Sequence, residues 1–170
     1  MKTPNFKLNA VLLCALAITI VSILPIVNII NIICGGMLLG GFLSVNYYYR
    51  QTGKNNLNIA VKDVFMITLL GGILSAIFVS GIFLLTMMTG KENQITLMKE
   101  QFGDMLRNVP QEFQKGLDDL SAEFDKYGFS PTLAITSLII NLIVHPIFAF
   151  VGGLISYGIN IRKKKQIPLQ

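Results

Sequence analysis

The chain has 170 residues, of which 52% are hydrophobic and 14% are charged, and its mean hydropathy is +0.61. A soluble domain has about 25% charged residues, so this composition argues against one. The sequence has one His, two Cys and no Trp. We therefore expect a small integral membrane protein, in which Cys14 and Cys34 are buried apolar residues rather than a disulfide or metal pair.

The charges are distributed unevenly along the chain. Eight of the nine acidic residues lie between Lys91 and Lys126, a stretch that also holds five Lys or Arg and has a net charge of −3. The rest of the chain has nine Lys or Arg and one acid, Asp63, for a net charge of +8. The positive charges sit on short tails and one short loop. This distribution is typical of a membrane orientation signal and not of a groove that binds nucleic acid.

The first long apolar stretch is predicted to form a hairpin. Residues 8–49 contain no charged side chain, and as one helix they would be about 63 Å long, twice the ~30 Å hydrocarbon core. We therefore predict membrane spans over residues 8–24 and 30–49, joined by a tight turn at Pro25. A cleaved signal peptide is not expected, because the second span follows without a polar start.

Two further spans are predicted, over residues 64–89 and 132–159, the last bent at Pro146. Between them, residues 91–127 are hydrophilic but have apolar residues at spacings of three and four, which indicates an amphipathic helix. Pro110 divides this segment, so we expect two helices. The apolar stripe consists of Ile95, Met98, Phe102, Met105, Val109, Phe113, Leu117, Leu120 and Phe124.

The predicted fold class is therefore an all-α integral membrane protein. It has four transmembrane helices in one membrane domain, residues 1–170, with an extracytoplasmic amphipathic helical segment, residues 91–127, between the third and fourth. Nine cations would lie on one side of the membrane and the acidic segment on the other. The positive-inside rule then places both termini in the cytoplasm, in the cytoplasmic (inner) membrane of a bacterium.

Small residues recur every four positions in three of the predicted spans. Such rows let helix backbones approach closely, and we expect packing within one monomer rather than a dimer face. The predicted packing residues are Gly36, Gly40, Ser44, Gly72, Ala76, Ser80, Gly152, Gly153 and Ser156.

His145 is the one ionisable side chain expected deep in the membrane, one helical turn after Asn141. Such a residue is a candidate for a proton relay or a ligand contact. The structural alternative is a neutral imidazole that hydrogen-bonds Asn141 or a backbone carbonyl freed by Pro146. We favour this alternative, because a relay needs several such residues.

Enzyme classes are not supported by the sequence. The predicted spans contain neither paired carboxylates nor a metal-ligand cluster, and no Ser lies in a nucleophile-elbow motif. We therefore predict no catalytic site, no metal and no cofactor. The expected function is that of a non-enzymatic structural or interaction protein in the lipid bilayer, with no nucleic-acid partner. The alternative is a small transporter or channel subunit that uses His145 and Asn141 near the bilayer midplane.

The apolar stripe of residues 91–127 has three candidate destinations. A membrane surface is disfavoured because the segment has a net charge of −3, whereas helices on anionic lipid are usually cationic. A self-contained hairpin is disfavoured because Gly103 and Gly116 weaken each helix. We therefore expect a second copy of the chain or a membrane-protein partner to complete the stripe.

The chain also resembles the domain-of-unknown-function family numbered four-one-nine-nine, roughly over residues 32–165. The likeness rests on a Gly-rich span that ends in Tyr47-Tyr48-Tyr49-Arg50 and Gly53, a Gly-rich third span and an acidic segment before the last span. The fourth feature of the likeness is Gly152-Gly153-Leu154-Ile155-Ser156, which precedes Arg162-Lys163-Lys164-Lys165. The resemblance implies an uncharacterised four-span bacterial membrane protein with no assigned activity.

Overall fold

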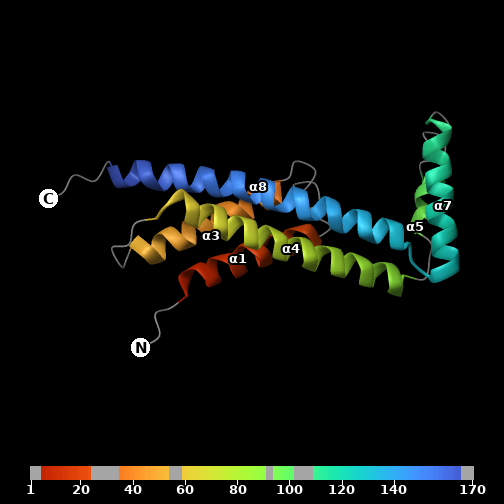
Figure 1. The fold of residues 1–170 in the computed structure, drawn as a ribbon, viewed down its shortest axis with the longest axis horizontal. Coiled ribbons are helices and arrows are strands. Elements are labelled where there is room, and N and C mark those ends of the chain that lie inside the picture. Colours follow the sequence, from red (N-terminus) through yellow and green to blue (C-terminus); the bar gives the residue numbers. More distant parts are fainter. Residues whose placement is uncertain (1–4, 24–34, 54–58, 91–93, 102–108, 166–170) are drawn as a thin grey trace. The chain divides into compact units, whose positions relative to one another are not determined.

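The structure is a computed structural model that describes residues 5–23, 35–53, 59–90, 94–101 and 109–165. In these residues it contains helices and no β-strand, which confirms the predicted all-α class. The helices are α1 (Phe6–Ile23), α3 (Gly35–Gly53), α4 (Val61–Thr89), α5 (Gln94–Gln101), α7 (Gln111–Tyr127) and α8 (Pro131–Lys165) (Figure 1).

The chain divides into two compact units. Residues 1–79 and 140–170 form the first, which we call the bundle unit, and residues 80–139 form the second, which we call the hairpin unit. Helices α4 and α8 each contribute residues to both units. The hairpin unit therefore contains α5 and α7 together with the last turns of α4 and the first turns of α8.

Three of the described helices, α1, α4 and α8, are long and apolar enough to cross a membrane. The sequence predicted four such helices, so this number is corrected to three for the described residues. Helix α3 does not qualify, because its residues include Gly35, Gly36, Gly40 and Gly41 and the polar Asn46, Arg50 and Gln51. Residues 30–34 of the predicted second span lie outside the described residues.

The four helices of the bundle unit alternate in direction. Lys7 at the start of α1 forms an ion pair with Asp63 at the start of α4, with 2.6 Å between Nζ and Oδ1. In the C-terminal parts of α8 and α3, Asn160 of α8 donates to Asn46 of α3 at 3.5 Å. Tyr48 of α3 packs with Ala10 of α1. The starts of α1 and α4 therefore lie at the same end as the ends of α3 and α8 (Figure 1).

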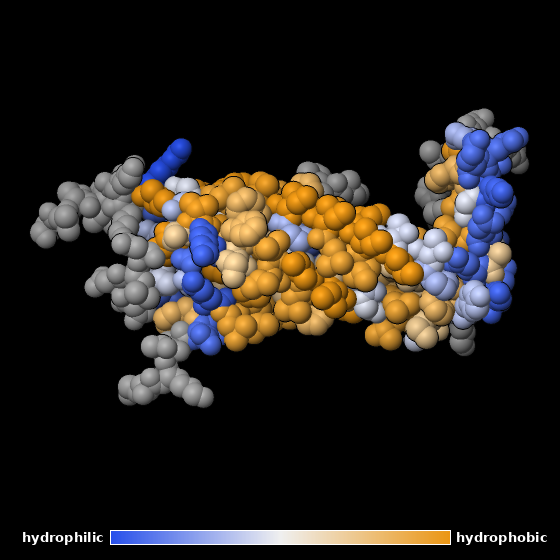
Figure 2. Space-filling model, in the orientation of Figure 1, coloured by the Kyte–Doolittle hydropathy of each residue, from blue (hydrophilic) through white to orange (hydrophobic). Residues whose placement is uncertain are grey.

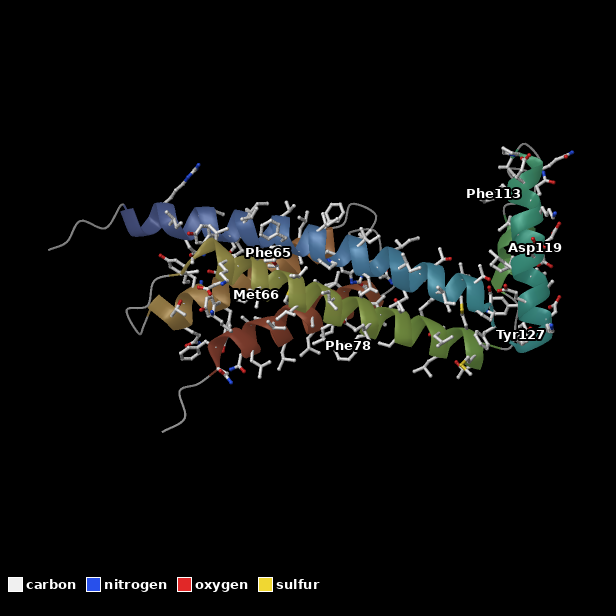
Figure 3. All side chains as sticks on the ribbon, in the orientation of Figure 1. Phe65, Met66, Phe78, Phe113, Asp119 and Tyr127 are labelled. Carbon is white, nitrogen blue, oxygen red and sulfur yellow. The ribbon has the colours of Figure 1, made fainter. Side chains whose placement is uncertain are left out.

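Large apolar side chains of the bundle unit point outward instead of inward. Examples are Leu16, Phe65, Phe78 and Ile143, of which 52%, 45%, 42% and 56% of the surface is exposed. Phe65 and Phe78 are labelled in Figure 3. Figure 2 shows the resulting apolar surface, with hydrophilic residues gathered at the end that contains the start of α1. An exposed apolar area of this extent marks contact with a membrane or with other protein.

The interior of the bundle unit, by contrast, is built mostly of small and hydroxyl residues. Fully buried positions include Ala10, Cys14, Ser44, Ala76 and Ala149. Cys14 is a free thiol, and Cys34 lies outside the described residues. Small side chains at contacts are how helices pack in lipid, where the hydrophobic effect does not drive helices together.

The hairpin unit has an apolar core of its own. Met87, Ile95, Leu117 and Phe124 are buried against one another, with Phe83, Leu120, Phe129 and Leu133 packed around them. Lys99 of α5 and Asp118 of α7 form an ion pair at 2.6 Å. Helix α5 therefore packs on α7, and both are joined to the last turns of α4 and the first turns of α8.

This core changes the expectation that a second chain must complete the apolar stripe. Ile95, Leu117 and Phe124 are covered within the unit by Met87 and Leu133, which the sequence argument did not consider because both belong to predicted spans. Phe113 remains 52% exposed. Of the rest of the stripe, Phe102, Met105 and the side chain of Met98 lie outside what the structure describes.

The ends of α7 and α8 follow from local chemistry. Helix α7 begins directly after Pro110, whose φ of −53° suits a helix entrance. It ends at Tyr127 and is capped by Gly128, whose φ of 75° is left-handed and whose N–H donates to the Phe124 carbonyl at 2.8 Å. Helix α8 then begins after Ser130, whose Oγ accepts the Leu133 N–H at 3.1 Å.

Candidate functional site

A buried polar pair joins α4 to α8 inside the bundle unit. Ser75 Oγ and His145 Nδ1 lie 2.9 Å apart, and the two side chains are 0% and 1% exposed. Ser75 also donates to the carbonyl of Gly72 at 2.8 Å. A hydroxyl has one proton, so Ser75 Oγ then accepts the Nδ1–H of the imidazole.

The close approach of α4 to α8 at this point depends on Gly72. A Cβ placed on Gly72 would lie 2.5 Å from Pro146 Cα and 2.6 Å from its nitrogen, which no real Cβ tolerates. Gly72 and Ser75 are three residues apart and so share one face of α4. The glycine therefore brings the helices close enough for Ser75 to reach His145.

The hydrogen-bond partner of His145 differs from both partners that the sequence suggested. Asn141 lies one turn earlier on the same helix and is half-buried, and the other expected partner was a carbonyl freed by Pro146. The imidazole bonds instead to Ser75 of another helix. The available signal was the Gly72-x-x-Ser75 spacing, which places a hydroxyl beside a close backbone contact.

A hydroxyl bonded to an imidazole is also the beginning of a nucleophile–base pair. Three observations favour a structural role for Ser75 and His145. Both side chains are almost fully buried, Ser75 is bonded back to its own helix, and backbone atoms of Pro146 fill the space beside Gly72. Within the described ranges, no group of three or more His, Cys, Asp or Glu is placed to hold a metal ion.

Adjacent glycines in the bundle unit contact different neighbouring helices. On α3, a Cβ at Gly40 would meet the Cys14 carbonyl of α1 at 3.3 Å, whereas a Cβ at Gly41 would meet the Ala149 carbonyl carbon of α8 at 2.6 Å. Adjacent residues point about 100° apart on a helix. A Gly-Gly pair therefore lets one helix pack closely against two others.

The pair on α8 behaves in the same way. A Cβ at Gly152 would meet the Leu38 carbonyl carbon of α3 at 2.7 Å, and one at Gly153 would meet Thr68 Cγ2 of α4 at 2.7 Å. The remaining predicted packing residues are placed as follows: Gly36 is buried, Ser44, Ala76 and Ser156 are 0% exposed, and Ser80 is 8% exposed in the hairpin unit. Sequence reasoning missed Gly41 and Gly71, because it followed one face of α3 and one face of α4.

The cationic end of the bundle unit is a second candidate site. Lys7 and Asp63 pair there, with 60% and 17% of their side chains exposed, and Asp63 Oδ2 also accepts the Ala60 N–H at 3.2 Å. The second bond resembles a capping box, in which a side chain in the first turn accepts a free N–H. Arg50 and Lys62 are exposed at the same end.

In the hairpin unit, Glu123 of α7 holds the start of α8. Its carboxylate accepts the hydroxyls of Ser130 and Thr132, each at 2.5 Å, and the Thr132 N–H at 3.1 Å. The pKa of Glu123 lies below its ordinary value, mainly because of the hydrogen bond from Ser130 and next because of that from Thr132. These bonds fix the corner between α7 and α8.

No family model, no curated protein and no solved structure matches the chain. The resemblance to an uncharacterised membrane-protein family therefore stays a prediction.

Proposed function

We propose that the protein is a non-enzymatic integral membrane protein that associates with itself or with another membrane protein through residues 91–127. The observation that carries this proposal is the inverted distribution of side chains in the bundle unit. Many large apolar residues such as Leu16 and Ile143 face outward, while the interior contains mostly small residues and a few larger ones such as Ile18 and Ile67. Only an apolar surrounding accommodates such a surface without cost.

We include α3 as a fourth membrane helix in this proposal, although its composition alone does not qualify it. Gly40 packs on α1 and Gly41 packs on α8, and both of those helices are apolar enough to span. A helix in contact with two spanning helices shares their depth. Its end at Tyr47, Tyr48 and Tyr49 has the composition of a headgroup boundary.

The proposed orientation places both termini in the cytoplasm, across the cytoplasmic membrane of a bacterium. The starts of α1 and α4 and the ends of α3 and α8 lie together, and these ends contain the cations of the bundle unit. The test is thiol labelling of spheroplasts after Cys14→Ala and Cys34→Ala. A cysteine at Gln111 should react with an impermeant reagent and one at Ala60 should not; the reverse pattern overturns the orientation.

Association is proposed through the part of α7 that the hairpin core leaves uncovered. Phe113 is 52% exposed at the start of α7, and Asp119 projects from a different side of the helix (Figure 3). An apolar ring surrounded by polar positions is the usual form of an interaction anchor.

Photo-crosslinking in native membranes tests this association. A photoreactive residue at position 113 should give a discrete adduct, either of twice the monomer mass or with a second membrane protein. The matched control is Ala122, which is also exposed on α7 and should give none. Equal adducts at both positions, or none at either, would count against association through α7.

A transporter or channel subunit is the second candidate, and one observation favours it. His145 is buried beside Ser75 within the bundle unit, where an ionisable residue is often functional. The test is proton flux into proteoliposomes. Flux above that of empty liposomes, lost in His145→Ala, would favour this candidate over an interaction protein.

A further inference from the structure

The cationic end of the bundle unit has far more positive charge than its own carboxylates can balance. Outside residues 91–126 the sequence has nine Lys or Arg and one acid, Asp63. Lys7 occupies one oxygen of Asp63 at 2.6 Å, and the Ala60 N–H occupies the other. Among the described side chains, Arg50, Lys62 and Arg162 are therefore left without a carboxylate of this end, and their counter-ions come from outside the chain.

Contacts between the helices place three exposed cations at nearly the same depth. Lys62 is adjacent to Asp63, which is level with Lys7 of α1 through their ion pair. Tyr48 of α3 packs with Ala10 of α1 and Ile67 of α4, so the start of α4 is level with the end of α3. Asn160 of α8 is level with Asn46 of α3. Arg162 lies two residues beyond Asn160, and Arg50 lies four beyond Asn46, so they stand about 3 Å and 6 Å further along their helices. A headgroup layer is about 5–8 Å thick on each side.

Arg50 and the end of α8 form the densest part of this surface. Arg50 is one turn after Asn46 and so shares its face of α3, and this face contacts α8 at Asn160. Helix α8 then ends with four consecutive cations, Arg162 to Lys165. Arg50 and Arg162 are both exposed. Two neighbouring parallel helices thus end in cations at one depth.

The helix dipole does not account for this arrangement. Cations are favoured at the carboxyl ends of helices, which fits Arg50 on α3 and Arg162 on α8. Lys62, however, lies in the first turn of α4, where the dipole favours an anion. Lys62 is a cation that its own helix disfavours, and it lies at the depth of Arg50 and Arg162. An anion bound at that depth explains its position better than the helix dipole does.

We propose that Arg50, Lys62 and Arg162 bind the headgroup phosphates of anionic phospholipids, such as phosphatidylglycerol, at this end of the bundle unit. The inference rests on the proposed membrane location. Basic residues beside membrane helices attract anionic headgroups, and guanidinium groups bind phosphate oxygens in pairs. The half-buried Tyr47 and Tyr49 of α3 have the amphipathic rings that are enriched at this depth.

Native mass spectrometry of the full chain in detergent tests the proposal. Phosphatidylglycerol and phosphatidylcholine of the same acyl composition are added together, and the ratio of bound lipids is measured. The wild type should prefer phosphatidylglycerol. In the double variant Arg50→Gln, Arg162→Gln this preference should fall about 30-fold, which corresponds to about 1 kcal/mol for each charge. The matched control Lys115→Gln, Lys126→Gln removes two exposed cations of α7 and should keep it.

Several outcomes would overturn the proposal: no preference in the wild type, an unchanged preference in the double variant, or an equal loss in the α7 control. Displacement of the lipid by inorganic phosphate alone would identify a free-anion site instead of a lipid site. If the double variant does not fold, the wild type is measured at about 1 M salt, where charges are screened beyond about 3 Å. A preference that persists there is not electrostatic.

Failure of the membrane proposal is recognised separately. Alkaline carbonate that releases the wild-type protein from cell membranes would overturn the membrane location itself. Retention in the membrane with no preference for anionic lipid would overturn only the lipid site.

Discussion

Gly71 and Gly72 are neighbours in α4 but contact two different helices. A Cβ at Gly71 would lie 2.6 Å from Cys14 Cβ of α1, whereas a Cβ at Gly72 would lie 2.5 Å from Pro146 Cα of α8. The pairs Gly40-Gly41 and Gly152-Gly153 divide their contacts in the same way. Three Gly-Gly pairs therefore link the four helices of the bundle unit, because each pair serves two faces at once.

This division of contacts gives a direct prediction for Gly72. Gly72→Ala should destabilise the protein by about 1–3 kcal/mol, the usual cost of overpacking, because the backbone of Pro146 has nowhere to move. Gly81→Ala, also in α4, has no atom within 4 Å of the added Cβ and should be neutral or stabilising by up to about 1 kcal/mol. Unfolding in mixed detergent micelles measures both, and equal effects would mean that the close contact is absent.

The Ser75–His145 hydrogen bond predicts a measurable coupling energy. Ser75→Ala and His145→Ala each remove one partner of this buried hydrogen bond, whose Oγ–Nδ1 distance is 2.9 Å. Bonds between membrane helices couple by about 0.6 kcal/mol on average and up to about 1.7 kcal/mol. The double-mutant cycle should give a value in this range for the free energy of unfolding. Additive effects of the two substitutions would show that the groups do not interact.

The hydrogen bonds of Glu123 predict that the stability of the corner between α7 and α8 depends on pH. Its folded-state pKa is lowered, first by the Ser130 hydrogen bond and then by Thr132. The stabilisation is therefore present above the pKa of the unfolded chain and is lost as the pH falls through the lower, folded value. Hydrogen exchange at the Thr132 amide should accelerate in that acidic range, after correction for the intrinsic rate.

The control for this effect is Glu123→Gln, which removes the charge and leaves the size unchanged. In this variant exchange at Thr132 should already be faster at neutral pH and should no longer depend on that titration. Glu112→Gln at the start of the same helix should behave like the wild type. Protection that is independent of pH in all three proteins would show that the carboxylate does not hold the corner.

The sequence was sufficient for the regular parts of this fold. Uncharged stretches marked α1, α4 and α8, since long apolar helices need no tertiary information to be recognised. Pro110 marked the start of α7. The partner of His145 could not be identified, because Ser75 is 70 residues away. The Gly72-x-x-Ser75 spacing marks a hydroxyl beside a close contact but does not say which helix makes that contact. Met87 and Leu133, which cover part of the amphipathic stripe, were missed for the same reason, because both looked like parts of spans.

The apolar core of the hairpin unit predicts two opposite responses along α7. Phe124 is 6% exposed and packs with Met87 and Leu117, so Phe124→Ala should cost about 3–5 kcal/mol and open the unit to protease. Phe113 is 52% exposed, so Phe113→Ala should leave protease resistance unchanged. If Phe113 is the association anchor, however, Phe113→Ala should abolish crosslinks from a neighbouring position such as Glu112. Equal protease sensitivity of both variants would mean that Phe113 belongs to the core and is not available to a partner.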